Sequence, residues 1–397
     1  MSGARVEAAA GPLLVVVPSV PNGSAGVSAV TVVGGLPLIT RIVRAAQTTG
    51  YAEVLVCDGD AGVRRLVERA GAAVVVSPSD IVAARERRRV VLVPANVVPQ
   101  PRWLRALLDE PIESERLYVD GASVVVVETT RPGAVIAAAA GATSAPAVVG
   151  LLSRMFDKGP EPLTLDGRFV VSSSGEVPRA EDWLLRSLIK ANEGFMSRHF
   201  ERRISLAITR RLASTRVTPD MMTLTSLAIG LSGAPFFLSS APALQLTGAL
   251  LFLIHSILDG CDGELARLKF QMSRRGAILD FWGDNAVHVA VFVCIAIGWT
   301  LGSGTAWPLL LGAAAAAATL GSAALMFERT AEDRPEGADS PVMARVTAAL
   351  ASRDFIYLLI LCAAFGKAAW FLAATAVGTP AYLLLVLWNE RRRGRVR

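Results

Sequence analysis

The sequence is poor in lysine, cysteine and aromatic residues. Among 397 residues there are four Lys and four Cys, and aromatic residues make up 6%. The cysteines lack the spacing of a zinc site or a disulfide framework, and they lie at Cys57, Cys261, Cys294 and Cys362. The beginning of the chain lacks a basic and then apolar run that ends in a cleavage site, so no signal peptide is expected.

Charge is also unevenly distributed. The net charge is +6 and hydrophobic residues make up 52% of the chain, which is too apolar for a fully soluble protein. Nearly all the positive charge is Arg, and it clusters beside hydrophobic segments. No nucleic-acid-binding motif is present, so we expect partners at a membrane surface and among phosphates.

Residues 11–180 contain no apolar run long enough to cross a bilayer. Short β-branched runs alternate there with helical patterns, which predicts a soluble, Rossmann-like α/β domain with a mostly parallel, doubly wound sheet. Residues 1–10 are expected to form a loose tail. The expected strands are 13–17, 53–57, 73–76, 90–93 and 123–127, and the expected helices are 37–49, 61–70, 101–109 and 145–156.

The stretch 183–213 has a different pattern. Apolar side chains recur at helical spacing between Arg and Lys residues. This pattern predicts one or two amphipathic helices that lie in the membrane interface.

Residues 217–390 predict an all-α membrane domain of six helices. The expected spans are 220–239, 243–265, 277–300, 305–327, 353–371 and 373–389. Arg-rich segments lie before the first span, after the second and fourth, and in the basic tail 391–397. The positive-inside rule then predicts a multi-pass protein of the cell inner membrane, with both termini, the first domain and the acidic motif in the cytoplasm.

Four aspartates lie at the ends of two expected spans. Asp259 and Asp262 are spaced i,i+3, and Asp280 and Asp284 are spaced i,i+4, so each pair shares one face of a helix. Acids at membrane depth are costly and indicate function. Because the ligands are all oxygen, the pattern points to Mg, Mn or Ca rather than zinc. Two carboxylate pairs could hold two ions, as in phosphoryl-transfer sites.

The segment that contains these aspartates resembles the signature of the CDP-alcohol phosphotransferases. Its pattern is D-x-x-D-G-x-x-A-R, eight residues, then G-x-x-x-D-x-x-x-D, with Gly263, Ala266, Arg267 and Gly276 at the other fixed positions. The family reaction transfers the substituted phosphate of a CDP-alcohol to an alcohol and releases CMP.

The resemblance implies a role for each matching residue. The four aspartates would hold two Mg²⁺ or Mn²⁺ ions, and Asp284 would also be the general base. The CDP-alcohol would contact the motif and the start of the first span, VTPDMMT, and the protein would form a homodimer. The implied donor-binding residues are Thr218, Pro219, Asp220, Gly263, Ala266, Arg267, Ser273 and Gly276.

The junction before the first span resembles two-domain inositol-phosphate enzymes, in which a cytidylyltransferase precedes the membrane domain. This resemblance implies an acceptor-phosphate site; the alternative is that the basic residues only extend to lipid headgroups. The acceptor-site candidates are Lys190, Ser197, Arg198 and Arg202.

Residues 11–180 resemble that cytidylyltransferase in the order of their segments, but catalytic parts are missing. The first loop lacks the glycine-and-arginine phosphate cradle, no Lys occurs before Lys158, and Asn96 stands where an Asp is expected. We therefore expect an inactive, nucleotidyltransferase-like domain that serves as a scaffold, dimer element or ligand sensor.

Three questions stay open on the sequence alone. CDP-diacylglycerol is favoured as the donor; the alternative is CDP-inositol, as in a di-inositol-phosphate synthase. A non-catalytic membrane scaffold is a third hypothesis. His255 and His288 lie four residues outside the two aspartate pairs. We expect them to pack against or support the site rather than act as the general base.

Overall fold

A computed structural model describes residues 11–19, 26–58, 60–74, 87–189, 195–331 and 354–394. The chain divides into two compact units, Met1–Ser187 and Leu188–Arg397. The expected tail 1–10 and the end of the expected strand 73–76 lie outside the described residues.

The first unit is built on a seven-stranded sheet with the order β10-β8-β9-β6-β1-β4-β5. Strand β1 is completely buried and pairs in parallel with both β4 and β6, so it lies at the centre, as its continuous apolar sequence predicts. The strands are β1 (Leu13–Val17), β4 (Glu53–Val56), β5 (Ala73–Val74), β6 (Arg88–Pro94), β8 (Arg116–Val119), β9 (Val125–Thr129) and β10 (Asp157–Lys158).

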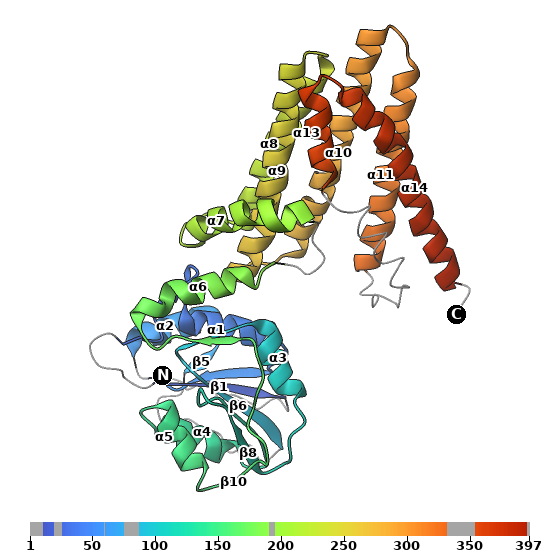
Figure 1. Ribbon diagram of the computed structural model, residues 1–397. Helices are drawn as coiled ribbons and strands as arrows, with labels where there is room; N and C mark the ends of the chain where they lie inside the picture. The colour runs from blue at the N-terminus through green and yellow to red at the C-terminus, as the bar shows by residue number, and fades with distance from the viewer. Residues whose placement is uncertain are drawn as a thin grey trace, which may run out of the picture. The chain divides into compact units, whose positions relative to one another are not determined.

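Helices cover both faces of this sheet (Figure 1), so the expected α/β class is confirmed. On one face lie α1 (Leu38–Gln47), α2 (Ala61–Ala70) and α3 (Pro101–Asp109), and on the other lie α4 (Pro132–Ala140) and α5 (Ala145–Leu152). The sheet is mixed, because β9 runs antiparallel to both β6 and β8. The sequence analysis missed β8 and α4; α4 contains five alanines and carries no clear amphipathic period.

Smaller elements complete the unit. Hairpin strands β2 (Val32–Val33) and β3 (Leu36–Pro37) pair with each other, and β7 (Val97–Pro99) pairs with β11 (Arg168–Val170). The 3₁₀ turn η2 (Ser174–Glu176) leads into α6 (Val177–Arg186). Leu184 and Leu185 are buried, so the first residues of the expected amphipathic stretch 183–213 belong to the core of this unit.

The second unit is helical. Five of its described segments are long and apolar enough to cross a membrane: Pro219–Leu238, Pro242–Lys269, Arg274–Ser303, Trp307–Phe327 and Ala368–Trp388. They correspond to α8 (Pro219–Gly233) with η4 (Ala234–Leu238), α9 (Pro242–Lys269), α10 (Arg274–Ser303), α11 (Trp307–Ala331) and α14 (Ala368–Gly394).

The expected count of six spanning helices is not confirmed. The expected span 353–371 is interrupted, because α13 covers only Phe355–Ala364 and α14 begins at Ala368. Gly366 has a φ of +66°, and the Lys367 N–H donates to Cys362 O at 2.8 Å, which is the geometry of a helix end. The sequence prediction therefore placed the last helix break several residues too late.

Glycines let the helices around the site approach closely. A Cβ on Gly248 of α9 would lie 2.8 Å from the carbonyl oxygen of Gly233 of α8. A Cβ on Gly298 of α10 would lie 2.2 Å from the Phe237 carbonyl oxygen. Small residues at such crossings allow backbones to touch, which fixes the relative positions of α8, α9 and α10.

A buried ion pair connects the segment before the bundle to α9. This segment contains a π-helical turn η3 (Ser197–Glu201) and α7 (Arg202–Ala213). Glu264 of α9 is fully buried; it forms an ion pair of 2.7 Å with Arg202 and accepts hydrogen bonds from Ser205 (2.7 Å) and Thr209 (2.6 Å). The Glu264 carboxylate thus holds α7 against the helix that carries the first aspartate pair.

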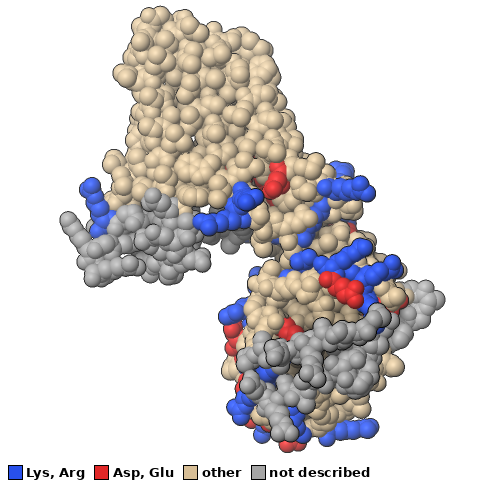
Figure 2. All heavy atoms as spheres, turned by 180° about the vertical axis from the view of Figure 1, so that it is seen from behind, with Lys and Arg blue, Asp and Glu red and all other residues tan. Residues whose placement is uncertain are grey.

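The other side of this segment exposes both apolar and basic side chains. Phe195, Phe200 and Ile204 are exposed, and Arg198 and Arg203 between them are exposed as well. On the face seen in Figure 2, charged side chains of the helical unit gather at one end, and the remainder of that face is uncharged. This distribution matches a bundle with one polar end.

A glycine substitution on α10 tests the close helix crossing. Gly298→Ala is expected to destabilise the bundle by about 1–3 kcal/mol, because the added methyl group meets backbone atoms that cannot move independently. Gly302, one turn further on, has nothing within 4 Å of an added Cβ, so Gly302→Ala is the matched control and should be neutral or slightly stabilising. Thermal unfolding in detergent measures both; equal midpoints for the two variants would contradict the packing described.

A double-mutant cycle tests the contact between α7 and α9. Glu264→Ala is expected to lower the free energy of unfolding by about 3–5 kcal/mol, because it leaves a partly buried guanidinium without its carboxylate. Arg202→Ala removes the same pair, so the double variant should lose less than the sum, with a coupling of about 1 kcal/mol or more. Additive losses would show that the two side chains do not stabilise each other.

Candidate functional site

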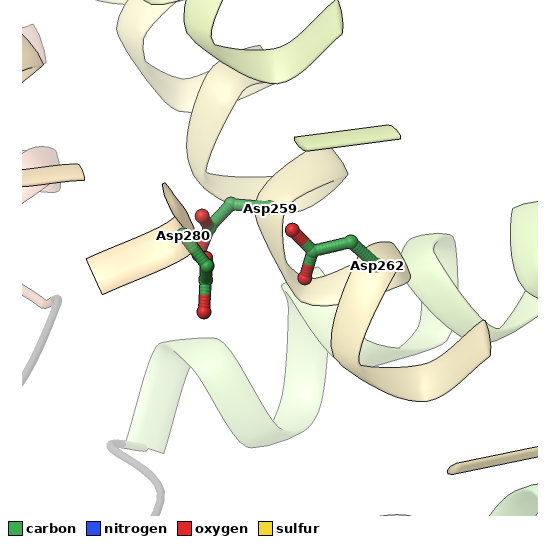
Figure 3. A group of neighbouring side chains, drawn as sticks. All are labelled: Asp259, Asp262 and Asp280. Atoms are coloured by element: carbon green, nitrogen blue, oxygen red, sulfur yellow. The ribbon is translucent and has the colours of Figure 1, made fainter. Parts of the chain in front are cut away.

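Three of the four predicted aspartates converge between α9 and α10. Asp259 and Asp262 come from α9 and Asp280 from α10, and one carboxylate oxygen of each lies within 4.8 Å of the others. Figure 3 shows the side chains of Asp259 and Asp280 next to each other, with Asp262 further along α9. Asp259 and Asp262 are buried. The i,i+3 spacing on α9 directs both carboxylates toward α10.

Asp284 lies outside this group of three, as far as the described residues show. One turn beyond Asp280, its Oδ1 lies 3.2 Å from Nε2 of His255. The fourth acid of the motif therefore has a histidine beside it. The sequence spacing alone did not predict this division, because it depends on the side chain that α9 presents to Asp284.

The start of α8 contributes to the same site. The Thr218 side chain caps α8 by accepting from the Met221 N–H at 3.3 Å. Thr223, one turn into the helix, donates its hydroxyl hydrogen to Oδ2 of Asp262. The sequence analysis selected Thr218, Pro219 and Asp220 and missed Thr223. Thr223 lies four residues after Pro219, and residues at this spacing share a helix face, so the spacing could have placed Thr223 at the same site.

The start of α10 lies close to the start of α8. Ser273 caps α10 by accepting from the Gly276 N–H at 2.9 Å. A Cβ on Gly276 would lie 2.9 Å from both the Asp220 carboxylate and the Ser273 hydroxyl. The motif glycine therefore keeps this junction open, and two candidate donor-binding side chains lie beside it.

The end of α9 holds the remaining motif residues. The Ala266 carbonyl oxygen accepts from the backbone of Gln271 at 2.8 Å, which closes the helix at Phe270 in the left-handed conformation. A Cβ on Gly263 would lie 3.3 Å from the Arg267 guanidinium. Arg267 is partly buried, and this cation one and a half turns from Asp262 could contact a phosphate.

The candidate acceptor residues are not equivalent. Ser197 is buried and Arg198 is exposed, while Arg202 forms the ion pair with Glu264 and lies 3.4 Å from the Gly260 carbonyl oxygen. Lys190 lies outside the described residues. Arg202 therefore has a structural partner within the helical unit.

This arrangement limits the chemistry. Three carboxylates within 4.8 Å between apolar helices form an all-oxygen donor set suited to Mg²⁺ or Mn²⁺. The serine, arginine and glycine positions around them could hold a phosphate. In the described residues, no His or Cys joins the group of three, which disfavours zinc.

Comparison with known proteins found similarity over the helical unit. Residues 216–388 match the family model for CDP-alcohol phosphatidyltransferase. Bifunctional IPC transferases and DIPP synthases are relatives: the one from Rubrobacter xylanophilus is 38% identical over 229 residues, which are 56% of this chain and 49% of the relative. The one from Thermococcus kodakarensis is 36% identical over 127 residues, 32% of this chain and 28% of the relative. The chain thus spans half or less of the length of these relatives.

The search of solved structures found phosphatidylinositol phosphate synthase from Mycobacterium tuberculosis, in one structure with CDP-DAG bound. It is 21% identical and the match covers 47% of this chain and 94% of that one, with a TM-score of 0.34. A second structure of that synthase, in complex with manganese and citrate, has a TM-score of 0.33 and 21% identity over 46% of this chain and 88% of that one. The matched range 216–388 includes the complete aspartate motif, so this part of the chain is similar to the CDP-alcohol phosphatidyltransferase family.

Proposed function

We propose that this protein is an integral-membrane CDP-alcohol phosphotransferase. It transfers the substituted phosphate of a CDP-alcohol to the hydroxyl group of a second alcohol and releases CMP. The observation that carries the proposal is the convergence of Asp259, Asp262 and Asp280 within a motif whose eight fixed positions are all present.

Asp259, Asp262 and Asp280 would hold the divalent ions, with Asp284 as an additional ligand, and the proposal is two Mg²⁺ or Mn²⁺ ions per site. The fit is supported by the donor set, because three carboxylates within 4.8 Å repel one another unless cations neutralise them. When bound, such ions offset the charge of the donor pyrophosphate and make its β-phosphorus open to attack.

The protein's own residues would bind the donor and move one proton. Arg267 and Ser273 contact the donor phosphates, and Gly263, Ala266 and Gly276 leave room for them. Thr218, Pro219 and Asp220 lie beside the cytidine. The carboxylate of Asp284 takes the proton of the acceptor hydroxyl, whose oxygen forms the new bond to the β-phosphorus, while the bond to the bridging oxygen breaks and CMP leaves.

CDP-diacylglycerol is the favoured donor, with an inositol phosphate as the acceptor. Arg198 is exposed beside buried Ser197, which supports an anionic acceptor near the start of the bundle. The second candidate is CDP-inositol, and it is favoured by relatives that carry the names IPC transferase and DIPP synthase.

The first unit is proposed to be a nucleotidyltransferase-like domain without catalytic activity. The amide of Asn96 donates to the Val171 carbonyl at 3.1 Å and the Val171 N–H donates to Asn96 O at 3.0 Å. Asn96 thus joins two segments where an active relative would need an acid.

Arg41, in the segment after the first loop, is buried and donates to the Val33 and Gly34 carbonyls. Burial lowers the pKa of Arg41 to about 10 despite nearby Glu181.

The proposed location is the cell inner membrane. The bundle would place α13 beside the five longer helices as a sixth membrane segment, with its buried residues Ile356 and Leu359 in the shared core. The first unit, the motif and the C-terminus would be cytoplasmic by the distribution of Arg. A homodimer is also proposed, with the small-residue surface of α11 as one possible contact.

Release of CMP by the purified protein in detergent tests this function. With Mg²⁺ or Mn²⁺, CDP-diacylglycerol and CDP-inositol are offered separately, each with inositol, inositol phosphate or glycerol phosphate, and a parallel reaction contains CTP and inositol phosphate. CMP is expected with the lipid donor, and no pyrophosphate is expected from CTP. Release with CDP-inositol alone would favour the second candidate. No release from any CDP-alcohol would contradict the proposed reaction, and turnover of CTP would contradict an inactive first unit.

Substitution of Asp284 tests the assignment of the general base. Asp284→Asn preserves the size of the side chain but removes its basicity, so kcat should fall by about 100-fold or more. Donor binding should stay close to that of the wild type, measured by equilibrium binding of the CDP-alcohol. Near-wild-type turnover in this variant would reject the role of Asp284 as base.

A further inference from the structure

We infer that His255 is a positioning residue that orients the carboxylate of Asp284; this inference deepens the proposed function and rests on it. His255 belongs to α9 and is fully buried. Its ring lies at the meeting point of three helices, where it touches α8 through Nδ1 and α10 through Nε2. The carboxylate group suited to metal does not include this histidine.

The two ring nitrogens have different partners. Nδ1 lies 3.0 Å from the carbonyl oxygen of Ser226, and a carbonyl oxygen can only accept a hydrogen bond, so Nδ1 carries a hydrogen. Nε2 lies 3.2 Å from Oδ1 of Asp284. In a hydrogen bond between these two atoms that leaves the Asp284 carboxylate free to act as a base, Nε2 is the donor and Oδ1 the acceptor.

The surroundings fix the plane of the imidazole ring. A Cβ on Gly230 of α8 would lie 2.9 Å from Cγ of His255, so the missing side chain at Gly230 makes room for the ring. Phe252 stacks on the ring with centroids 5.9 Å apart. Phe252 and the hydrogen bond at Nδ1 restrict the orientation of the ring. Nε2 therefore points in one direction, toward the Asp284 carboxylate on α10.

The four acids of the motif therefore have different roles in the site. Asp259, Asp262 and Asp280 form the group suited to metal, whereas the neighbour of Asp284 is an imidazole. A general base must point at the acceptor hydroxyl and keep that direction. The hydrogen bond from His255 restricts rotation of the Asp284 carboxylate, so we assign His255 to this task.

Two amide substitutions separate the contacts of the two nitrogens. The amide of Gln can reach the position of Nε2 and keep a donor toward Asp284, whereas the amide of Asn lies near the position of Nδ1 and keeps the contact with Ser226. His255→Asn should lower kcat for CMP release by about 10- to 100-fold, with the KM for donor changed by less than about threefold. His255→Gln should retain kcat within about fivefold of the wild type.

His288 provides the matched control. It lies four residues beyond Asp284 on α10 and its ring packs against Phe252 and Phe355. His288→Gln should leave kcat within about twofold of the wild type, and thermal unfolding reports any loss of folded protein in each variant. Equal losses of kcat in the Asn and Gln variants of His255, or a loss in neither, would overturn the positioning role.

A spectroscopic measurement separates failure of this inference from failure of the proposed function. The chain has only three histidines, so ¹⁵N-histidine labelling of the full-length protein gives few resonances, which His→Gln variants assign. Asp284→Asn should shift the Nε2 resonance of His255 and leave those of His288 unchanged. An unchanged His255 resonance would refute the contact even if no tested CDP-alcohol were turned over.

Discussion

The repulsion among buried carboxylates is the constraint on which the second unit depends. Three acids within 4.8 Å would cost about 3 kcal/mol or more for each ionised pair at the effective dielectric of a protein. An apolar bundle has little water to reduce that cost. The helices must therefore be held together by other contacts, and the acids must be compensated by a ligand that the bundle is built to receive.

Those other contacts are close backbone crossings and one internal ion pair. Glycines at the crossing of α8 with α9 and at the crossing of η4 with α10 let backbone atoms approach. On α9, Glu264 follows Asp262 by only two residues, so the two side chains point to different sides of the helix. Glu264 meets a cation and two hydroxyl groups from α7. Glu264 is therefore an acid with a structural role whose charge is neutralised within the protein, and it lies beside the acids that face α10.

The sequence predicted much of this arrangement because helix periodicity relates spacing to position. The i,i+3 and i,i+4 aspartate pairs lie on α9 and α10 as expected, and α2 and α3 have the predicted bounds. Prediction failed where the result depends on contacts between segments. The antiparallel insertion of β9 has no local signature, and the break at Gly366 occurs within an apolar run that length alone assigns to one helix.

The division among the four acids was similarly beyond the sequence. The sequence analysis assigned all four aspartates to the metal site and gave Asp284 the additional role of base, and in the structure three of them converge. His255 lies four residues before Asp259 in sequence but reaches Asp284 across the α9–α10 contact. Thr223 was missed for the same reason, because its hydroxyl group finds Asp262 across the α8–α9 contact.

The central claim is that α9 and α10 together form a divalent metal site, and direct binding of Mn²⁺ tests it. Electron paramagnetic resonance of free Mn²⁺ in titrations of the purified protein gives affinity and stoichiometry without dependence on the substrate. Asp280→Asn should weaken Mn²⁺ binding by about tenfold or more, whereas Asp284→Asn should change it much less. Wild-type binding in the Asp280 variant, or no bound Mn²⁺ in the wild type, would contradict the account.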